Sequence, residues 1–206
     1  MLATSPKTKF RRSKRQAFTL IELLMVIAVI LILAGITFGI TRGVQNAQAR
    51  TRAKAELASI AQSLEQFKST NGDYPWVRGE PEEFAKALLG WMEFERSDNG
   101  ARFVEKDSDD VPPGGPKSFI DPTKLNFTGA LPDTPDQVPQ IEFIDPWGNA
   151  YIYLYKDSAA GEWNNFGYVL YSSGADGRDT PVDDDGILEQ SDRDIPNNAD
   201  NIYGGE

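Results

Sequence analysis

A single carboxylate, Glu22, stands at the start of the most apolar stretch of the chain. The eighteen residues that follow, 23–40, carry no charge, and as a helix they are long enough to cross most of a bilayer. A carboxylate in such a position is costly unless it finds a partner. The chemistry expected of Glu22 is therefore pairing with a positive charge.

The acidic tail is the second region whose residue types suggest chemistry. Residues 176–206 carry ten acids against two arginines. Runs of like charge are usually solvated, but glycines interleave with these acids, and Ca²⁺ selects oxygen ligands on loops that glycine permits. Residues 183–186 with Asp192 follow an EF-hand register only in part, because Pro181 occupies the first ligand position. The tail is either a disordered acidic run or a calcium-holding loop, and not an EF-hand.

The composition excludes several classes of protein. The chain has 206 residues and a formal charge of −10; without its first 17 residues it keeps 15 basic residues against 31 acidic ones, a charge of −16. Nucleic-acid binding needs a basic face, so this strongly negative charge argues against a nucleic-acid-binding protein. The chain has no Cys and no His, so it lacks the usual general base and the commonest zinc ligands. An enzyme built on carboxylates alone remains an alternative.

Basic residues border the apolar stretch and predict its orientation. Six precede it without any acid, and four follow at Arg42, Arg50, Arg52 and Lys54. The excess at the amino end predicts a cytoplasmic leader over residues 1–17 and an outward-facing remainder. A secretory signal peptide is the alternative, but its core is usually shorter. A plain anchor fits the length and leaves Glu22 unexplained.

A long helix is predicted to position Glu22 and the apolar stretch relative to the rest of the chain. Residues 18–40 predict the transmembrane half, and residues 41–72 an amphipathic stem. In the stem, apolar residues three and four apart form one stripe: Leu57, Ile60, Leu64 and Phe67. Asn71-Gly72 predicts the end of the helix. Glycines at 35, 39 and 43 indicate a small-residue ridge, a point of local melting, or the ordinary glycine content of membrane helices.

The remaining residues, 73–206, predict a globular head. A short helix begins at Pro81 and ends near Gly90. Residues 95–140 are rich in Pro, Gly and Asp, and predict a variable loop that is either a surface insertion or a partner-binding segment. Strands are expected at 141–144, 151–155 and 168–172. Their aromatic residues indicate either a core between sheet and helix or a carbohydrate platform.

The amino-terminal residues resemble a known family. Ala17-Phe18-Thr-Leu-Ile-Glu22 after a basic leader resembles the type IV prepilin class III signal. The resemblance implies that prepilin peptidase, a membrane aspartyl protease, cuts before Phe18 and methylates the new amine. Ala17 departs from the pattern, since the usual residue there is Gly. Cutting at this bond creates a cationic amine one helical turn from Glu22, so that the amine and a neighbouring copy's Glu22 can neutralise each other in a filament.

Two head segments extend the resemblance. Residues 145–149 with Tyr151, and residues 172–177 before the acidic tail, are similar to the major pseudopilin of type II secretion systems, and residues 71–75 look like the family's helix exit. The resemblance implies an α+β fold, type IV pilin-like, with the long helix packed on a small antiparallel sheet. It also implies a carboxyl-terminal calcium loop over residues 173–206. Its expected ligands are Asp176, Asp192, Ser173 and Asp185.

The function implied is that of a non-enzymatic structural subunit of a secretion pseudopilus. Its expected partners are further copies of itself, prepilin peptidase, the inner-membrane assembly platform and minor pseudopilins, with no nucleic acid. Its expected place is the bacterial inner membrane, single-pass, with a cytoplasmic amino terminus and a periplasmic head. A type IV pilin for adhesion, motility or DNA uptake is the nearest alternative, although the absence of paired cysteines argues mildly against it.

Overall fold

The structure is a computed structural model of the chain that describes residues 18–77, 79–98, 100–156, 163–182 and 185–204. At residues 36–42, 97 and 108 it describes the backbone alone. The longest element is helix α1, Leu20–Asn71. The chain divides into two compact units, Met1–Val44 and Gln45–Glu206. The second half of α1 therefore belongs to the same unit as the head.

The first unit consists of the amino-terminal half of α1. The large apolar side chains that it describes are exposed in the single chain, from Phe18 at one end to Val44 at the other. Among the described residues, no helix combines the length and the apolar composition needed to span a membrane. Residues 36–40 of the expected span have side chains outside the described residues. Gly39 of the expected glycine ridge is one of these, so the ridge stays a prediction.

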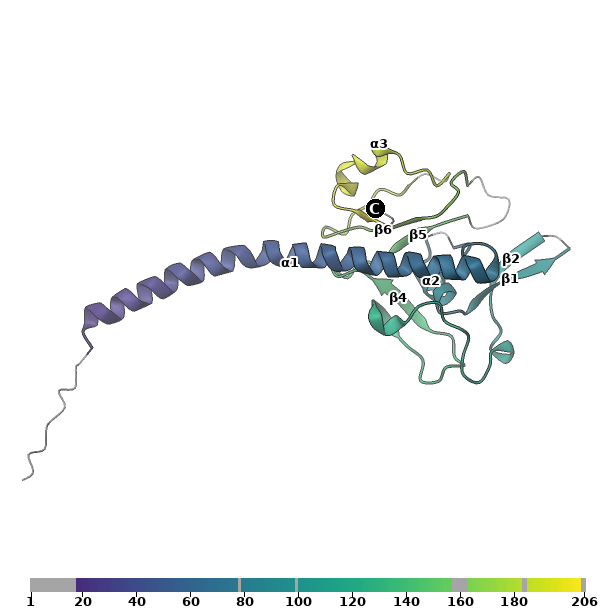
Figure 1. Cartoon of the computed structure of the whole chain (residues 1–206), viewed down its shortest axis with the longest axis horizontal. Helices are drawn as coiled ribbons and strands as arrows, with labels where there is room; N and C mark the ends of the chain where they lie inside the picture. The colour runs from purple at the N-terminus through teal and green to yellow at the C-terminus, as the bar shows by residue number, and fades with distance from the viewer. Residues whose placement is uncertain (1–17, 78, 99, 157–162, 183–184, 205–206) are drawn as a thin grey trace, which may run out of the picture. The chain divides into compact units, whose positions relative to one another are not determined.

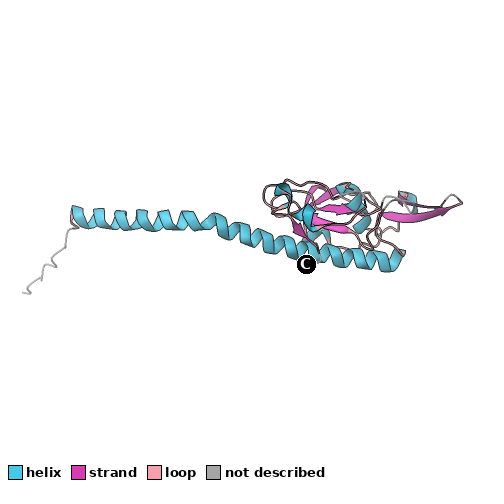
Figure 2. Ribbon diagram, turned by 90° about the horizontal axis from the view of Figure 1, so that it is seen from above, coloured by secondary structure: helices cyan, strands magenta, loops and turns pink. Residues whose placement is uncertain are grey.

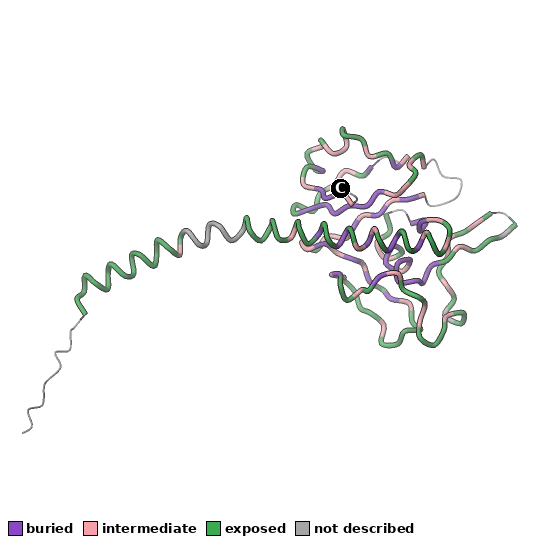
Figure 3. The backbone as a smooth tube through the Cα atoms, viewed as in Figure 1, coloured by how far each residue is buried: buried purple, intermediate pink, exposed green. Residues whose placement is uncertain are grey.

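The second half of α1 buries one face against the head. The apolar stripe expected from the sequence is confirmed, because Leu57, Ile60, Leu64 and Phe67 are all buried, and Ala53 extends the stripe by one turn. The buried residues of the head, purple in Figure 3, lie along strands, the short helix and the loops between them. The helix ends as expected: the N–H of Gly72 donates to the carbonyl of Lys68 at 2.7 Å, and its φ of +92° favours glycine.

The head is a chain of short elements (Figure 1). A helix, α2, spans Pro81–Leu88, with Pro81 in the first turn and Glu82 and Glu83 beside it. The remaining elements follow in chain order: β1 Met92–Ser97, β2 Gly100–Glu105, η1 Ser108–Asp110, η2 Pro122–Lys124, β3 Asn126–Ala130, β4 Gln140–Ile144, β5 Ile152–Leu154, β6 Val169–Ser172, α3 Gln190–Arg193, η3 Pro196–Asn198 and β7 Ile202–Tyr203.

The described strands, magenta in Figure 2, form three small antiparallel sheets rather than one. β1 pairs with β2, β3 pairs with β4, and β5, β6 and β7 form the third sheet in that order. The expected α+β architecture with an antiparallel sheet is confirmed at this coarser level. The acidic tail is not a disordered run throughout, because β7 places Tyr203 opposite Tyr171 and Ile202 opposite Ser172.

Residues 95–140 differ from the expected loop. They contain most of the β1–β2 hairpin and the whole of β3. The hairpin is held by aromatic packing, since Phe94 and Phe103 face each other in register and both rings contact Phe67 of α1. The strands were not predicted because the region is rich in Pro and Gly and its alternation of apolar and polar residues is short. The residue that packs against the hairpin, Phe67, lies on the stem, far away in the sequence.

The aromatic residues of the third sheet form a core. Tyr151, Tyr153, Tyr155 and Tyr171 are buried, and the ring of Tyr153 stacks on Phe84 of α2 at 4.5 Å between centroids. Edge-to-face contacts join Tyr74 to Tyr155 and to Tyr168. The described tyrosines therefore fit the interpretation as core residues better than a carbohydrate platform.

Candidate functional site

The amino-terminal turn of α1 holds the Glu22 carboxylate. Its Oε2 accepts hydrogen bonds from the backbone N–H of Thr19 at 2.9 Å and from the Thr19 hydroxyl at 2.8 Å. The Thr19 hydroxyl in turn accepts from the backbone N–H of Glu22 at 3.3 Å. This is a capping box, with Thr19 before the first helical residue and Glu22 three positions on.

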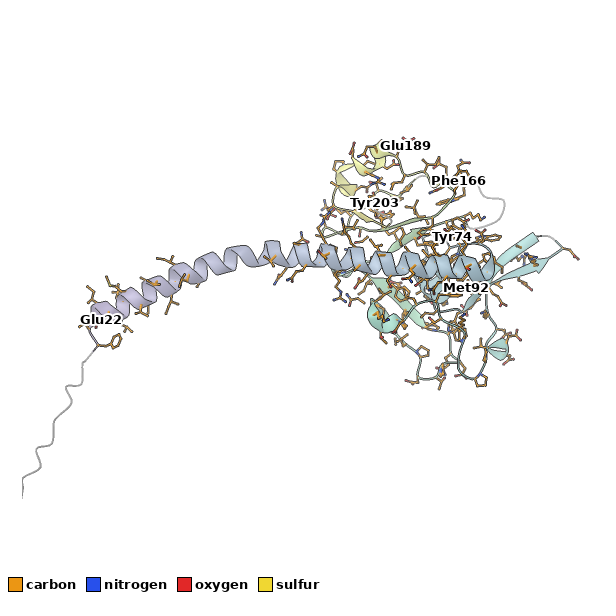
Figure 4. All side chains as sticks on the ribbon, in the orientation of Figure 1. Glu22, Tyr74, Met92, Phe166, Glu189 and Tyr203 are labelled. Carbon is orange, nitrogen blue, oxygen red and sulfur yellow. The ribbon has the colours of Figure 1, made fainter. Side chains whose placement is uncertain are left out.

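The capping box places the carboxylate beside the expected cut. Phe18 and Glu22 are exposed in the single chain and share the first turn; Figure 4 labels Glu22 at this end of α1. Ala17 and the rest of the leader lie outside the described residues. The role of Thr19 was not anticipated from the sequence, although the Thr-x-x-Glu spacing is itself a recognised sign of a capping box. The turn thus presents an acid to an incoming cation.

A second group of charged residues joins the stem to the head. The Tyr151 hydroxyl donates to Glu56 Oε2 at 2.6 Å, and Arg52 Nε donates to Glu56 Oε1 at 2.7 Å. Arg52 also reaches Asn126 of β3 at 2.8 Å. Burial, followed by the bond to Glu56, raises the pKa of Tyr151 far above its usual value. Glu56 is only 5% exposed, and a carboxylate so buried needs these partners.

Asp73 accepts several hydrogen bonds at the point where the chain leaves the stem. Its carboxylate accepts from the Tyr155 hydroxyl at 2.7 Å and from Trp76 Nε1 at 3.0 Å, and it pairs with Lys156 at 2.6 Å. Burial acts to raise the pKa of Asp73, but the hydrogen bonds from Lys156, Tyr155 and Trp76 outweigh it and hold the pKa below its usual range. The helix exit is therefore tied to the end of β5.

The two head segments that resemble pseudopilins meet in space. Asp145 is 1% exposed, and its Oδ1 accepts from the backbone N–H groups of Trp147 and Asn149, each at 2.9 Å. Its Oδ2 accepts from the Ser172 hydroxyl at 2.6 Å. Asn149 Nδ2 donates to the carbonyl of Gly174 at 3.0 Å. The turn at 145–149 is thus locked to the loop at 172–177.

Asp200 of the tail completes this loop. Its Oδ2 accepts from the backbone N–H groups of Ala175 and Asp176 at 2.8 and 3.2 Å. Gly174 has φ +71°, and a Cβ there would stand 2.5 Å from the carbonyl oxygen of Asp200, so only glycine fits. No feature of the sequence distinguishes Asp200 from the other acids of the tail as the one that approaches this loop.

The four expected calcium ligands do not form one cluster. Asp176 lies next to Asp200 and Ser173 is buried in the same loop. Asp192 caps the amino end of α3 by accepting from the N–H of Glu189, and Asp185 accepts from the N–H of Ile187. Within the described ranges, which omit Asp183 and Asp184, no group of three or more acids is placed to hold a metal.

One observation nevertheless fits a cation near Asp176. Asn201 follows Asp200 and is 8% exposed, and its Oδ1 is a buried side-chain oxygen with no hydrogen-bond partner among the described residues. Such an atom is costly to bury unless it is paired. The β6–β7 register, which sets Ser172 opposite Ile202, brings Asn201 to the loop that contains Ser173. Asp176, Asp200 and Asn201 are thus oxygen donors of the kind that calcium takes.

Comparison with known proteins supports the interpretation of the amino-terminal turn and that of the head. The prokaryotic N-terminal methylation motif matches residues 12–38, which include Ala17, Phe18 and Glu22. The type II secretion system core protein G of Pseudomonas aeruginosa is 29% identical over 175 residues, which cover 85% of this chain and 94% of that protein. No solved structure matches the chain significantly.

The motif and the fold together resemble one class of protein, the type IV pilin-like proteins with a prepilin-type amino terminus. Within that class, its similarity to core protein G runs through the head and the stem and not only through the motif. The resemblance inferred from the amino-terminal and loop residues is confirmed.

Proposed function

We propose that the chain is a structural subunit of a type II secretion pseudopilus and has no catalytic activity. The observation that carries this is the amino-terminal turn, where Thr19 and Glu22 hold a carboxylate one turn from the predicted amine of Phe18. It is supported by the match of residues 12–38 to the methylation motif and by the similarity to core protein G.

Prepilin peptidase is the first proposed partner. It removes residues 1–17 and methylates the Phe18 amine, which keeps its positive charge. In the assembled filament that amine lies against Glu22 of a neighbouring copy, and neither charge is then buried alone. The exposed apolar side chains of the first unit are covered by other copies.

The subunit is anchored in the bacterial inner membrane before assembly. We place its leader in the cytoplasm and its acidic head on the outer side, in accordance with the distribution of basic residues. The assembly platform and the minor pseudopilins are the partners that would add it to a growing filament.

Calcium is the proposed structural cofactor of the carboxyl-terminal loop. Asp176, Asp200 and Asn201 are the residues that would hold it, and the buried Oδ1 of Asn201, which has no hydrogen-bond partner among the described residues, supports this choice. The ion would supply positive charge between acids that otherwise repel one another. Asp192 and Asp185, the other acids expected from the sequence, each accept from a backbone N–H of their own turn, as Asp176 does from the N–H of Arg178.

Intact mass tests the first step of this function. The full chain is produced in a host with an active prepilin peptidase and in the same host without it. We expect a mature protein that begins at methylated Phe18 only when the peptidase is present. A chain that begins at Met1 in both hosts contradicts the filament proposal. So does one cut after Ala49, because the small residues of Ala47-Gln48-Ala49 suit a secretory signal peptidase.

A further inference from the structure

The segment that follows β4 bonds to the stem at two points. The indole Nε1 of Trp147 donates to Asn46 Oδ1 at 3.1 Å, and the hydroxyl of Tyr151 donates to Glu56 Oε2 at 2.6 Å. Asn46 and Glu56 lie ten residues apart in the sequence, which is about 15 Å along a helix. Both share a face of α1 with the buried Ala53, because they lie seven residues before it and three after it. Trp147 therefore holds the same face of the stem as Tyr151, but nearer to its amino-terminal end.

The composition of α1 around Asn46 is that of a weak helix. Glycine is among the least favourable residues in a helix interior, and asparagine ranks below alanine and leucine. A Cβ added at Gly43 would meet no described atom within 4 Å, so no close contact in the single chain requires a glycine there. Most helical stability in a protein comes from tertiary packing. We therefore expect the turns around Asn46, the second residue of the second unit, to depend on contact with the head.

Trp147 is held in place by its own turn. Its backbone N–H donates to Asp145 Oδ1 at 2.9 Å, and Asp145 is only 1% exposed. The side chain of Trp147 is partly buried and packs against the main core cluster. Little rotamer freedom therefore remains to be lost when the indole N–H meets Asn46.

The same turn is bonded to the loop at 172–177. Asp145 Oδ2 accepts from the Ser172 hydroxyl at 2.6 Å, and Asn149 Nδ2 donates to the carbonyl of Gly174 at 3.0 Å. These contacts lie on either side of the tryptophan in the sequence. A displacement of the loop therefore acts on the turn that positions the indole.

We propose that Trp147 is a positioning residue that transmits the state of the loop at 172–177 to the stem. With this loop closed on Asn149, the indole bonds to Asn46 and the surrounding turns of α1 stay helical. When the loop opens, the turn before β5 shifts, the bond is lost and those helical turns open more often. The coupling needs no bound ion and no second copy of the chain, so it stands apart from the proposed function.

Amide hydrogen exchange of the full chain in detergent micelles, followed by mass spectrometry, tests the role of the indole. Trp147→Phe keeps an aromatic ring and removes the N–H donor. Amides of residues 46–53 should exchange about three- to fivefold faster, as expected for the loss of one hydrogen bond. Amides of residues 60–67, deeper in the same stem, should be unchanged. A residue needed only for packing would raise exchange in both segments.

Trp163→Phe is the matched control. It removes an indole N–H that donates to the carbonyl of Gly167 at 2.8 Å and not to the stem. Exchange of residues 46–53 should therefore stay at the level of the unaltered chain.

Substitutions of the acceptor test the same bond from the other side. Asn46→Val removes the acceptor, whereas Asn46→Asp keeps an oxygen that can accept from the indole, and the three residues have similar helix propensities. Asn46→Val should reproduce the effect of Trp147→Phe, and Asn46→Asp should retain the protection. Asn46→Val combined with Trp147→Phe should exchange no faster than either alone, because both remove one bond.

The link to the loop is tested by Asn149→Ala, which removes the donor to Gly174. It should speed exchange of residues 46–53 in the unaltered chain and add nothing in the Trp147→Phe background. Asn149→Asp, which keeps the size and loses the donor, should give the same result, and residues 60–67 report that the fold is intact. Effects of Asn149→Ala that add to those of Trp147→Phe, or no effect of Asn149→Ala at all, overturn the link. Trp147→Phe without an effect on residues 46–53, or with an equal effect on residues 60–67, overturns the positioning role.

Discussion

The Tyr151 hydroxyl lies 2.6 Å from Glu56 Oε2, and both residues are buried although 95 positions separate them in the chain. The bond runs from the start of β5 to the middle of the stem, and Arg52 holds the other oxygen of the same carboxylate. The stem is therefore docked on the head by a charged group and not by its apolar stripe alone. Together with the Asp73 contacts at the helix exit, that group helps to define the position of the stem along the helix axis.

Tyr151→Phe should lower the stability of the second unit. It leaves a buried carboxylate without one of its donors, at a cost of about 1–3 kcal/mol. Urea unfolding of a protein that starts at Gln45 measures the free energy of unfolding. Tyr168→Phe is the matched control, because no hydrogen bond of its hydroxyl is described among the residues of the structure, and it should change stability by less than about 0.5 kcal/mol. Equal effects of the two substitutions would contradict the role given to Glu56.

Glu22→Leu should leave processing and membrane insertion largely intact and abolish most filament assembly. The segment becomes more apolar, so insertion does not suffer, while the Phe18 amine loses its partner and a buried unpaired charge costs about 3–5 kcal/mol. Filament imaging and intact mass measure the two steps separately. Thr19→Val removes the hydroxyl of the capping box and keeps the carboxylate, so it should lower the stability of the helix by only about 1 kcal/mol. Normal filaments from Glu22→Leu would sink the pairing hypothesis.

Acid should weaken the second unit partly through Asp73. Its folded-state pKa is held below the usual value, so the unfolded chain binds the proton first as the pH falls. The contribution is fully present above the ordinary carboxyl pKa of about 3.9 and is lost as the pH falls through the lower folded-state value. Asp73→Asn should therefore flatten the stability profile below about pH 5, measured by urea unfolding at several pH values. Glu95→Gln, an exposed change in β1, should retain the slope of the unaltered protein.

Calcium should raise the melting temperature of the second unit. A ligand at about 100 times its dissociation constant adds about 2.7 kcal/mol, or roughly 5–10 °C for a domain of this size. Asp176→Ala should abolish most of the difference between millimolar Ca²⁺ and chelator, Asn201→Ala should reduce it strongly, and Asp192→Ala should weaken it less. Asp136→Asn is the control on a distant acid. Identical melting curves with and without Ca²⁺ would favour the alternative interpretation, in which the tail is a solvated acidic loop.

The local features of the chain could be predicted from its sequence. The stripe from Leu57 to Phe67 follows from spacing alone, and the helix ends at Gly72 because glycine accepts the conformation required there. The strands near 141–144, 151–155 and 168–172 follow from their apolar and aromatic runs. The amino-terminal motif was equally legible, because the basic leader, Phe18 and Glu22 are close in sequence. In each case the determining interactions lie within a few residues of one another.

Only the tertiary structure decided which distant residues meet. Nothing in the spacing of the tail distinguishes Asp200, which accepts a hydrogen bond from the N–H of Ala175, from Asp192, which caps its own helix. Phe94 and Phe103 form a hairpin in a region of loop-like composition because Phe67 of the stem supplies their packing. From the sequence alone, Glu56 looks like an ordinary surface glutamate. It is buried because Tyr151, which directly precedes β5, lies against it and donates a hydrogen bond to it. Local periodicity specifies an element and its apolar face, whereas burial of a particular polar group depends on the element that comes to lie against it.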